Sequence, residues 1–235
     1  MKNVIVFGTN QFSELLTWHL EKEQNTVIAA YTVDGDYIGE DSMYKGKPVV
    51  PFEKVEELYP PEQYGIYVCV GYNNMNQVRE RVFVQAKEKG YHILSYVHPT
   101  ATVLTDDFGE GNIIMERALI GAFVKVGSGN VFWPDTHVAH HTVIGDFNFF
   151  TISSAVAGNI IIGNNCFFGN NCTIRDGIAI ANYTLVGAGC YLSESTEPYS
   201  VYVPARSVQL EGKSSLEIRG LKVQSKEKYK SEENH

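Results

Sequence analysis

The chain has 235 residues and a formal net charge of −8 at pH 7. This length allows one or two domains with a hydrophobic core. Because binding to nucleic-acid phosphates requires clustered lysine and arginine side chains, and the sequence has no basic stripe, the composition argues against a nucleic-acid partner. The opening apolar run is too short for a signal peptide, and no stretch approaches eighteen apolar residues, so we expect a cytoplasmic protein without membrane insertion.

The first part of the chain, residues 1–97, alternates between predicted strands and helices. A buried strand, an amphipathic helix and a second strand come first, which is the order of a βαβ unit. The alternation then continues, and it predicts a small Rossmann-like parallel sheet covered by helices. We expect strands at residues 3–7, 26–33, 65–71 and 92–97, and helices at residues 11–23, 51–58 and 75–89.

Ligands of such sheets bind at the carboxyl ends of the strands, where loops and helix N-termini meet. Here these loops are residues 8–11, 33–36 and 71–74. A dinucleotide site would need three glycines after the first strand, and Gly8 stands alone, so an NAD site is not expected. A single nucleotide fits the loops. An equally good interpretation is that Gly8 and Gly71 form tight turns and that Asp34 caps a helix.

A strict period of six residues dominates the second part, residues 98–210. A bulky apolar residue recurs at every sixth position, often followed by glycine, and a small residue stands four positions later. Neither the helical period of 3.6 nor the strand period of 2 gives this pattern. The apolar series is Phe108, Ile114, Ile120, Val126, Phe132, Val138, Ile144, Phe150, Val156, Ile162, Phe168, Ile174, Ile180, Val186 and Leu192.

Three six-residue units make one triangular coil, and stacked coils can pair their backbones around a prism. The period therefore predicts a parallel β-helix of about five coils. Cys166, Cys172 and Cys190 share the small position of the repeat, so we expect them at inner corners rather than in a disulfide or a metal site. Residues 211–235 form a tail rich in charged side chains.

Three histidines in the repeats, His137, His140 and His141, are candidates for chemistry. Since Val138 points inward, His140 should lie near the next corner, open to solvent or to a neighbouring chain. An exposed histidine can accept a proton near neutral pH. It is also a common surface residue. Three histidines within five residues are badly placed for one zinc ion, so no metal is expected.

The ordered motifs resemble the two-domain sugar acyltransferases with a left-handed β-helix, including the PglD-like and NeuD-like enzymes. They run from the first strand through His98-Pro99, the segment His140-His141-Thr-Val-Ile-Gly145 and Ala157-Gly158-Asn159 to Val-Pro-Ala-Arg206. The left-handed sense of the helix is taken from this resemblance. It further implies a homotrimer that transfers an acetyl group from acetyl-CoA to a nucleotide-linked sugar, for surface glycans such as lipopolysaccharide or capsule.

The resemblance also implies roles for individual residues. His140 matches the general base, with His141 as the alternative base, and Gly158 matches the glycine whose N–H faces the thioester oxygen. Gly187 and Ala188 match the pantetheine groove, and Arg206 would meet a CoA phosphate. The residues that would hold the uridine or thymidine diphosphate are Gly8, Asn10, Gln11, Asp34, Gly71 and Tyr72.

Three departures from the family pattern leave parts of this function open. The carboxylate that commonly follows the catalytic histidine is replaced by His141, so the partner that orients His140 is not indicated. A second histidine is missing near Phe149, which leaves the acceptor sugar undefined, and Thr9-Asn10-Gln11 replaces the usual Gly-Gly-His. Two alternatives remain: an O-acetyltransferase of a sialic-acid-like sugar, and a non-catalytic β-helix that binds a nucleotide.

Overall fold

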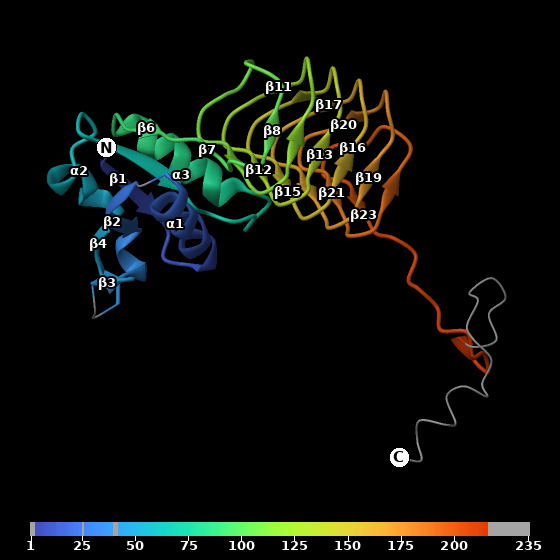
Figure 1. Ribbon diagram of the computed structural model, residues 1–235, viewed down its shortest axis with the longest axis horizontal. Coiled ribbons are helices and arrows are strands. Elements are labelled where there is room, and N and C mark those ends of the chain that lie inside the picture. The colour runs from blue at the N-terminus through green and yellow to red at the C-terminus, as the bar shows by residue number, and fades with distance from the viewer. Residues whose placement is uncertain (1–2, 25, 40–41, 216–235) are drawn as a thin grey trace, which may run out of the picture. The chain divides into compact units, whose positions relative to one another are not determined.

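The computed structural model describes residues 3–24, 26–39 and 42–215, and its ribbon is shown in Figure 1. Residues 1–204 form one compact unit and residues 205–235 form a second. Every candidate site residue except Arg206 lies in the first unit. Most of the tail predicted over residues 211–235 falls outside the described residues.

The N-terminal sheet has six strands in the order β3-β4-β2-β1-β5-β6. All neighbouring pairs are parallel except β3 with β4. The strands are β1 (Asn3–Phe7), β2 (Val27–Val33), β3 (Met43–Tyr44), β4 (Lys47–Pro51), β5 (Tyr64–Val68) and β6 (His92–Ile93). The helices are α1 (Gln11–Glu23), α2 (Val55–Leu58) and α3 (Gln77–Glu88), with short 3-10 turns η1 (Gly35–Tyr37) and η2 (Phe52–Lys54).

Helices α1 and α3 cover opposite faces of this sheet because the side chains of a strand alternate. On β1, Val4 and Val6 pack in the cluster that contains Leu16 of α1, whereas Ile5 and Phe7 pack in the cluster that contains α3 side chains. The predicted Rossmann-like class is confirmed.

Two details of the sheet differ from the prediction. Strands β3 and β4 were not expected, and the strand predicted over residues 92–97 is two strands. Its first half, β6, pairs with β5, whereas its second half, β7 (Tyr96–Val97), pairs with β9 in the β-helix. Between them the Ser95 hydroxyl accepts a hydrogen bond from the N–H of Asn112 at 3.0 Å, so the chain already joins the first coil there.

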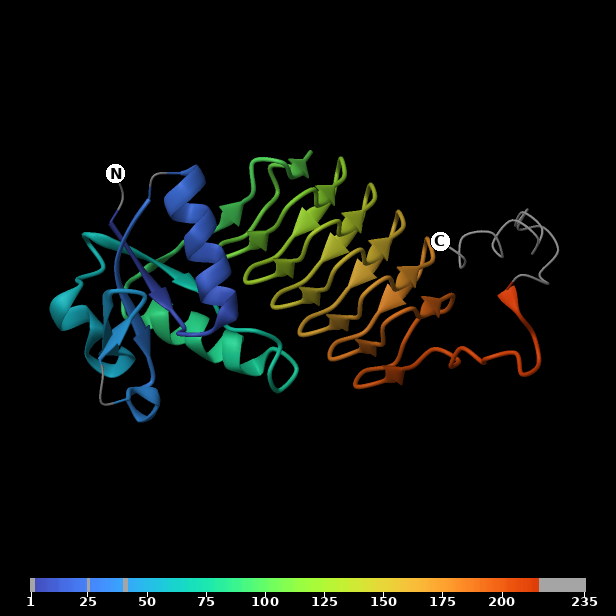
Figure 2. The same cartoon turned by 60° about the horizontal axis from the view of Figure 1, so that its bottom comes forward.

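The repeats form a left-handed β-helix of stacked triangular coils, as predicted (Figure 2). Each strand has two residues, and the second of them points inward, which explains the period of six. One face is the sheet β8 (Thr102–Val103), β10 (Leu119–Ile120), β13 (His137–Val138), β16 (Ala155–Val156), β19 (Thr173–Ile174) and β22 (Tyr191–Leu192). The second is β11 (Lys125–Val126), β14 (Val143–Ile144), β17 (Ile161–Ile162) and β20 (Ala179–Ile180). The third is β7, β9 (Ile113–Ile114), β12 (Val131–Phe132), β15 (Phe149–Phe150), β18 (Phe167–Phe168), β21 (Leu185–Val186) and β23 (Val201–Tyr202).

The interior of the prism is built from columns of like residues. The rings of Phe132, Phe150 and Phe168 stack with centroids 4.8 and 4.5 Å apart. Asn112 and Asn130 each accept, through Oδ1, the backbone N–H found one coil later at 2.8 Å. Buried polar atoms are costly unless paired, so this ladder fixes the register of the coils. Cys166, Cys172 and Cys190 are buried, as expected for inner positions of the repeat.

Arg79 of α3 joins the sheet domain to the β-helix. Its side chain is buried and donates hydrogen bonds to the carbonyl oxygens of Gly71, Gly129 and Phe147 at 2.8, 2.9 and 2.7 Å. Burial lowers the pKa of Arg79 to about 9, so the guanidinium stays charged at neutral pH. The N-terminal loops are thereby held rigidly against the coils.

Candidate functional site

His140 and His141 form the turn between β13 and β14, at one corner of the prism. Both side chains are exposed, and Val138 is fully buried, as the phase of the repeat predicts. His141 has a φ of +58°, the left-handed conformation that the second turn residue takes in every regular coil. The next coil of the β-helix holds this corner, because the N–H of Asn159 donates to the carbonyl of His140 at 3.0 Å.

The two imidazole rings contact each other through their Nδ1 atoms, which are 3.1 Å apart. One of these atoms donates and the other accepts. When His140 is the donor, its Nε2 lone pair is free to take a proton from a substrate. The His141 ring is in turn packed on Phe123, one coil earlier, with ring centroids 4.8 Å apart. The carboxylate missing after His140 is therefore replaced by an imidazole that an aromatic ring supports.

Gly158 lies one coil after His140 and next to its imidazole ring. A Cβ atom at this position would come within 2.7 Å of His140 Cε1 and 3.1 Å of both ring nitrogens. Only glycine leaves room for the imidazole here. Within the part of the chain that the structure describes, the N–H of Gly158 has no hydrogen-bond partner. A free donor thus stands beside a candidate base.

Gly187 and Ala188 belong to a different corner from His140. The N–H of Gly187 already donates to the carbonyl of Tyr202 at 2.8 Å. The N–H of Ala188 has no hydrogen-bond partner in the part of the chain that the structure describes. Within one chain these two residues and His140 lie at opposite edges of the face formed by β10, β13, β16, β19 and β22. Arg206 is exposed and lies in the second unit.

The candidate nucleotide-binding residues lie together at the carboxyl edge of the N-terminal sheet. Gly8 follows β1, Asp34 follows β2, and Gly71 follows β5. Backbone bonds tie these ends together, with the N–H of Gly8 donating to Thr32 and the N–H of Cys69 donating to Phe7, both at 2.9 Å. Gln11, exposed, is the first residue of α1.

Several of these side chains already have structural partners. The amide of Asn10 caps α1 by accepting from the N–H of Ser13 at 3.0 Å, and it donates to the carbonyl of Cys69 at 3.1 Å. Tyr72 packs against the Phe149 and Phe167 rings on the β-helix, with centroids 5.1 and 4.7 Å apart. These contacts leave the backbone N–H groups at the start of α1 as the groups best placed for an anion.

Asp34 faces a charged cavity of about 500 Å³ beside α3. Its carboxylate pairs with Arg81 at 2.7 Å. Glu53 accepts from the N–H of Gly35 at 3.1 Å, and Glu56 pairs with Lys89 at 2.7 Å. Both cationic side chains of the cavity, Arg81 and Lys89, are therefore already paired, and the further carboxylates of Glu53 and Glu88 leave it negatively charged.

One group of side chains that could bind a metal ion occurs in the described residues, where α1 meets the start of the β-helix. Single ligand atoms of His19, His98 and Glu116 lie within 4.8 Å of one another. However, Nδ1 of His98 accepts from the N–H of Thr100 at 3.1 Å, so its Nε2 carries the hydrogen and faces Glu23 Oε1 at 3.2 Å. In this tautomer Nε2 of His98 is a donor, while the buried ring nitrogens of His19 lie 3.3 Å from Glu23 and 3.2 Å from Glu116.

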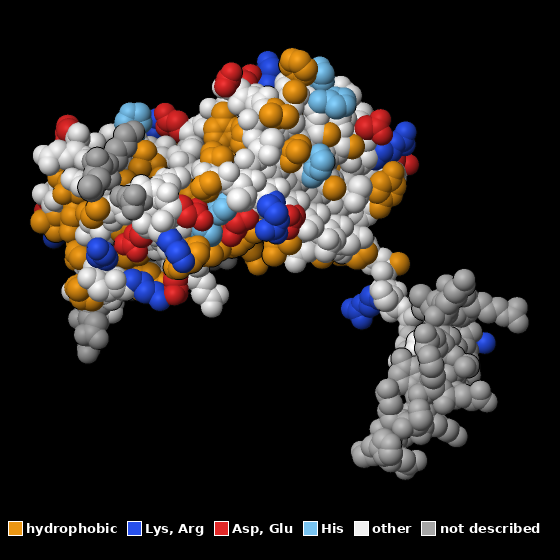
Figure 3. Space-filling view, viewed as in Figure 1, with side chains coloured by type: hydrophobic (Ala, Val, Ile, Leu, Met, Phe, Trp, Pro, Cys, Tyr) orange, Lys and Arg blue, Asp and Glu red, His pale blue; other side chains and the backbone are white. Residues whose placement is uncertain are grey.

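The surface view shows histidine side chains beside hydrophobic ones on the visible face of the β-helix (Figure 3). Phe123 and Ile161, on the corner and the face that adjoin the histidine pair, are 71% and 62% exposed. Phe123 was not predicted as a site residue from the sequence. Its position eighteen residues before His141, one full coil, is the signal that could have found it.

No helix in the described residues is long and apolar enough to cross a membrane.

Comparison with known proteins supports the fold. A family model described as "Bacterial transferase hexapeptide (six repeats)" matches residues 159–194. No curated protein sequence matches the chain.

Three solved structures are similar over most of the chain. The acetyltransferase domain of PglB from Neisseria gonorrhoeae shares 20% identity at a TM-score of 0.73, covering 86% of this chain and 96% of that one. PerB from Caulobacter crescentus, in complex with CoA and GDP-perosamine, shares 23% at a TM-score of 0.74, covering 87% and 96%. A histidine-to-alanine variant of GDP-perosamine N-acetyltransferase from the same organism shares 20% identity at a TM-score of 0.66, covering 87% of this chain and 95% of that one. The chain has the fold of these proteins.

Proposed function

We propose that this protein transfers the acetyl group of acetyl-CoA to the amino group of a nucleotide-linked amino sugar, as a step in the synthesis of a surface glycan such as lipopolysaccharide or capsule. The observation that carries the proposal is the corner at His140. An imidazole with a free Nε2 lies there beside the unpaired N–H of Gly158. The fold that carries this corner is shared with a protein crystallised with CoA and GDP-perosamine.

In the proposed reaction the amine nitrogen attacks the thioester carbonyl carbon. A nitrogen–carbon bond forms, the carbon–sulfur bond breaks, and CoA leaves as the thiolate. His140 Nε2 accepts the proton that the nitrogen loses and passes it to the leaving sulfur. His141, through its Nδ1 contact at 3.1 Å, holds His140 in the tautomer that this step needs.

Gly158 would serve the carbonyl oxygen. Negative charge develops on this oxygen as the tetrahedral intermediate forms, and a fixed backbone donor in a partly desolvated site stabilises it. The N–H of Gly158 is free among the described residues, and the missing side chain lets both the thioester and the His140 ring approach. The N–H of Ala188 would contact the pantetheine chain, and Arg206 a CoA phosphate.

The nucleotide would bind at the carboxyl edge of the N-terminal sheet. A diphosphate fits the N-terminus of α1, where Gly8, Asn10 and Gln11 lead into thirteen helical residues. Asp34, Gly71 and Tyr72 lie at the same edge and would contact the nucleoside. Arg79 keeps this edge in a fixed position relative to the coils.

We further propose a homotrimer in which adjacent β-helices complete the site, working in the cytoplasm, where both substrates are made. His137 and Tyr191 lie on one outer face of the prism, and Tyr191 is 66% exposed. An exposed aromatic surface of this kind suits a subunit contact. Sedimentation should give three times the mass of the chain, and a monomer at micromolar concentration would contradict this assembly.

The function is tested by incubating the protein with acetyl-CoA and amino sugars linked to UDP, dTDP or GDP. Release of free CoA and acetylation of the sugar amine should occur in equal amounts with at least one sugar. Transfer to a hydroxyl instead would identify the O-acetyltransferase alternative. Nucleotide binding without any CoA release would identify the non-catalytic alternative.

A further inference from the structure

Phe123 lies beside the histidine pair, at the same corner of the preceding coil. Its ring centroid is 4.8 Å from that of His141, and the two ring planes are inclined by 36°. Since successive coils are spaced by roughly 4.8 Å, the two rings are neighbours along the axis of the β-helix and face each other. The Phe123 side chain is 71% exposed, so packing in the core does not account for a phenylalanine here.

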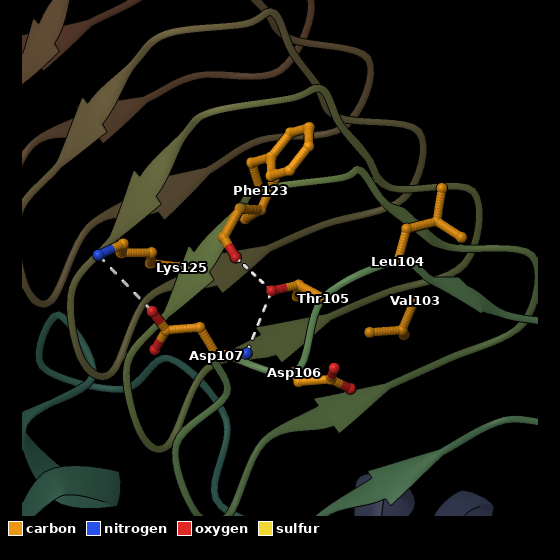
Figure 4. Close-up of a pocket in the computed structure, with 8 residues that line it drawn as sticks. Val103, Leu104, Thr105, Asp106, Asp107, Phe123 and Lys125 are labelled. Carbon is orange, nitrogen blue, oxygen red and sulfur yellow. Dashed lines mark hydrogen bonds and ion pairs between the residues drawn. The ribbon is translucent and has the colours of Figure 1, made fainter.

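The first coil leaves the other side of the Phe123 ring open. Thr105, eighteen residues earlier, does not take the left-handed conformation that Phe123 and His141 share. Its hydroxyl instead donates to the carbonyl of Val124 at 2.6 Å, and a cavity of about 650 Å³ opens there (Figure 4). Among the aromatic rings that the structure describes, the Phe123 ring pairs with His141 alone. The contact with the histidine pair is therefore the interaction that distinguishes this ring.

Proton transfer to His140 would create a positive charge at a corner without a counter-ion. No carboxylate of the described residues forms an ion pair with His140 or His141. The contact between the two Nδ1 atoms, at 3.1 Å, provides a path for this charge. When His140 Nε2 takes the proton of the amine, the hydrogen on His140 Nδ1 can shift to the lone pair of His141 Nδ1. His140 is then neutral and His141 is an imidazolium, and the reverse shift follows when His140 Nε2 gives its proton to the leaving sulfur.

An aromatic ring favours the charged form of His141 over the neutral form. The faces of an aromatic ring are negative, and they attract a cation that lies within about 6 Å of the ring centroid, more strongly where water is displaced. The His141 ring meets this condition on Phe123. The contact therefore stabilises the state that forms during the reaction more than the resting state, which is the condition for an effect on kcat.

We propose that Phe123 is a positioning residue that acts through His141: the face of its ring stabilises the positive charge that His141 takes over from His140 during acetyl transfer. The proposal rests on the proposed function. It gives Phe123 the electrostatic part that a carboxylate next to His140 would have.

The test replaces Phe123 by phenylalanine analogues with one, two or three fluorine atoms on the ring, which weaken the negative face and nearly preserve the size. Steady-state kinetics with acetyl-CoA and an amino-sugar nucleotide should show a stepwise fall in kcat, roughly three- to thirtyfold for the trifluorinated ring, at unchanged KM. Phe123→Leu should lose as much, and Phe123→Trp should keep most of the parent kcat. The same analogues at Tyr199, which is 72% exposed and stacked on Tyr183, are the matched control and should give a constant kcat.

A double-mutant cycle shows whether Phe123 acts through His141. The side-chain oxygen of His141→Gln can accept the hydrogen of His140 Nδ1, but this side chain carries no charge. In the His141→Gln background Phe123→Leu should therefore cause no further loss of kcat. Losses that multiply independently would mean that Phe123 acts without His141, and they would overturn the proposal.

A second measurement does not require turnover. At one fixed pH near neutrality, the magnetic resonance signal of the His141 Cε1–H group reports the charge of the ring, and fluorination of Phe123 should reduce this charge. If the parent transfers no acetyl group, the proposed function fails, and this signal decides alone: a charge that falls along the series supports the stabilisation by Phe123, and a constant charge overturns it. If acetyl transfer occurs but kcat stays constant along the series, or only KM rises, the proposal is wrong and the function stands.

Discussion

At the scale of single residues, the proposed catalysis depends on the space that Gly158 leaves for His140. Gly158→Ala would place a Cβ atom 2.7 Å from His140 Cε1 and push the ring away from its present position. Because the ring is an exposed side chain, we expect a lower kcat with little loss of stability. Steady-state kinetics and thermal unfolding of the same variant check this result.

Gly39→Ala is the matched control, since a Cβ there would meet no atom within 4 Å. It should change neither kcat nor the unfolding temperature. If Gly158→Ala behaved like Gly39→Ala in both measurements, the His140 ring would not be working in the position described.

The sequence predicted some residues of this site and not others. His140 and Gly158 follow from the phase of the repeat together with the family resemblance, and the structure brings them into contact. Phe123 was not predicted, because its contact with His141 depends on which corners stack, and that requires the coil as well as the period. Nucleotide binding by Asn10 stays a prediction, and the structure adds that its side chain caps α1.

At the scale of elements, the six-residue phase makes opposite predictions for two adjacent residues of β17. Ile162 is 2% exposed and Ile161 is 62% exposed. Ile162→Asp would bury an unpaired carboxylate and should cost several kcal/mol, on the order of 3 or more, whereas Ile161→Asp should fold. Thermal unfolding and soluble yield of both variants test this, and equal tolerance would show that the phase is misassigned.

Asn164 looks like a natural surface control for Ile162 in the sequence, but the structure argues against it. Its Oδ1 accepts a hydrogen bond from the N–H of Asp146 at 2.8 Å, and its own N–H donates to Asn182 at 2.8 Å. Asn164 therefore links coils. The repeat shows which residues point inward, but not which outward side chains bridge to the next coil.

A second element-scale prediction concerns the contact between α1 and the first coil. Burial alone would raise the pKa of Glu23, but the hydrogen bond from Tyr96 and the nearby rings of His19 and His98 lower it overall. A carboxylate with a lowered folded pKa adds stability above its unfolded pKa, near 4.3, and loses it as pH falls through the folded value. Glu23→Gln should thus unfold at a lower temperature than the parent at pH 7.

This difference between Glu23→Gln and the parent should shrink as pH falls below about 4, because the parent then loses the same charge. Thermal unfolding across the acid range measures it. A difference that stayed constant down to pH 2 would mean that packing, and not the charge of Glu23, accounts for the effect.

At the scale of the whole molecule, the two halves of the first unit are joined through Arg79. Arg79→Met would leave buried carbonyl oxygens of Gly129 and Phe147 without this donor and should cost about 3 kcal/mol or more. Arg81→Met, on the same helix, removes an exposed ion pair with Asp34 and should cost about 1 kcal/mol or less. Urea unfolding compares them, and equal costs would contradict a special role of Arg79.

The joint between the halves was the part of the fold least accessible to the sequence. An arginine in a polar helix is normally an exposed residue, and nothing in the pattern indicates that Arg79 is buried against two coils. The division of the strand at residues 92–97 between two sheets was missed for the same reason, since both halves are apolar. Local patterns determine the elements, while contacts between distant segments decide how the elements meet.

The central claim is that His140 is the base for acetyl transfer to an amine, and the most direct test is the turnover of His140→Ala on an amino-sugar nucleotide that the parent protein acetylates. The account predicts that kcat falls by roughly 10² to 10⁴ while acetyl-CoA still binds and the assembly is unchanged. His141→Ala, which removes only the ring that orients the base, should cost less. Full turnover by His140→Ala at saturating substrate would contradict the account, and a larger loss for His141→Ala than for His140→Ala would move the base to His141.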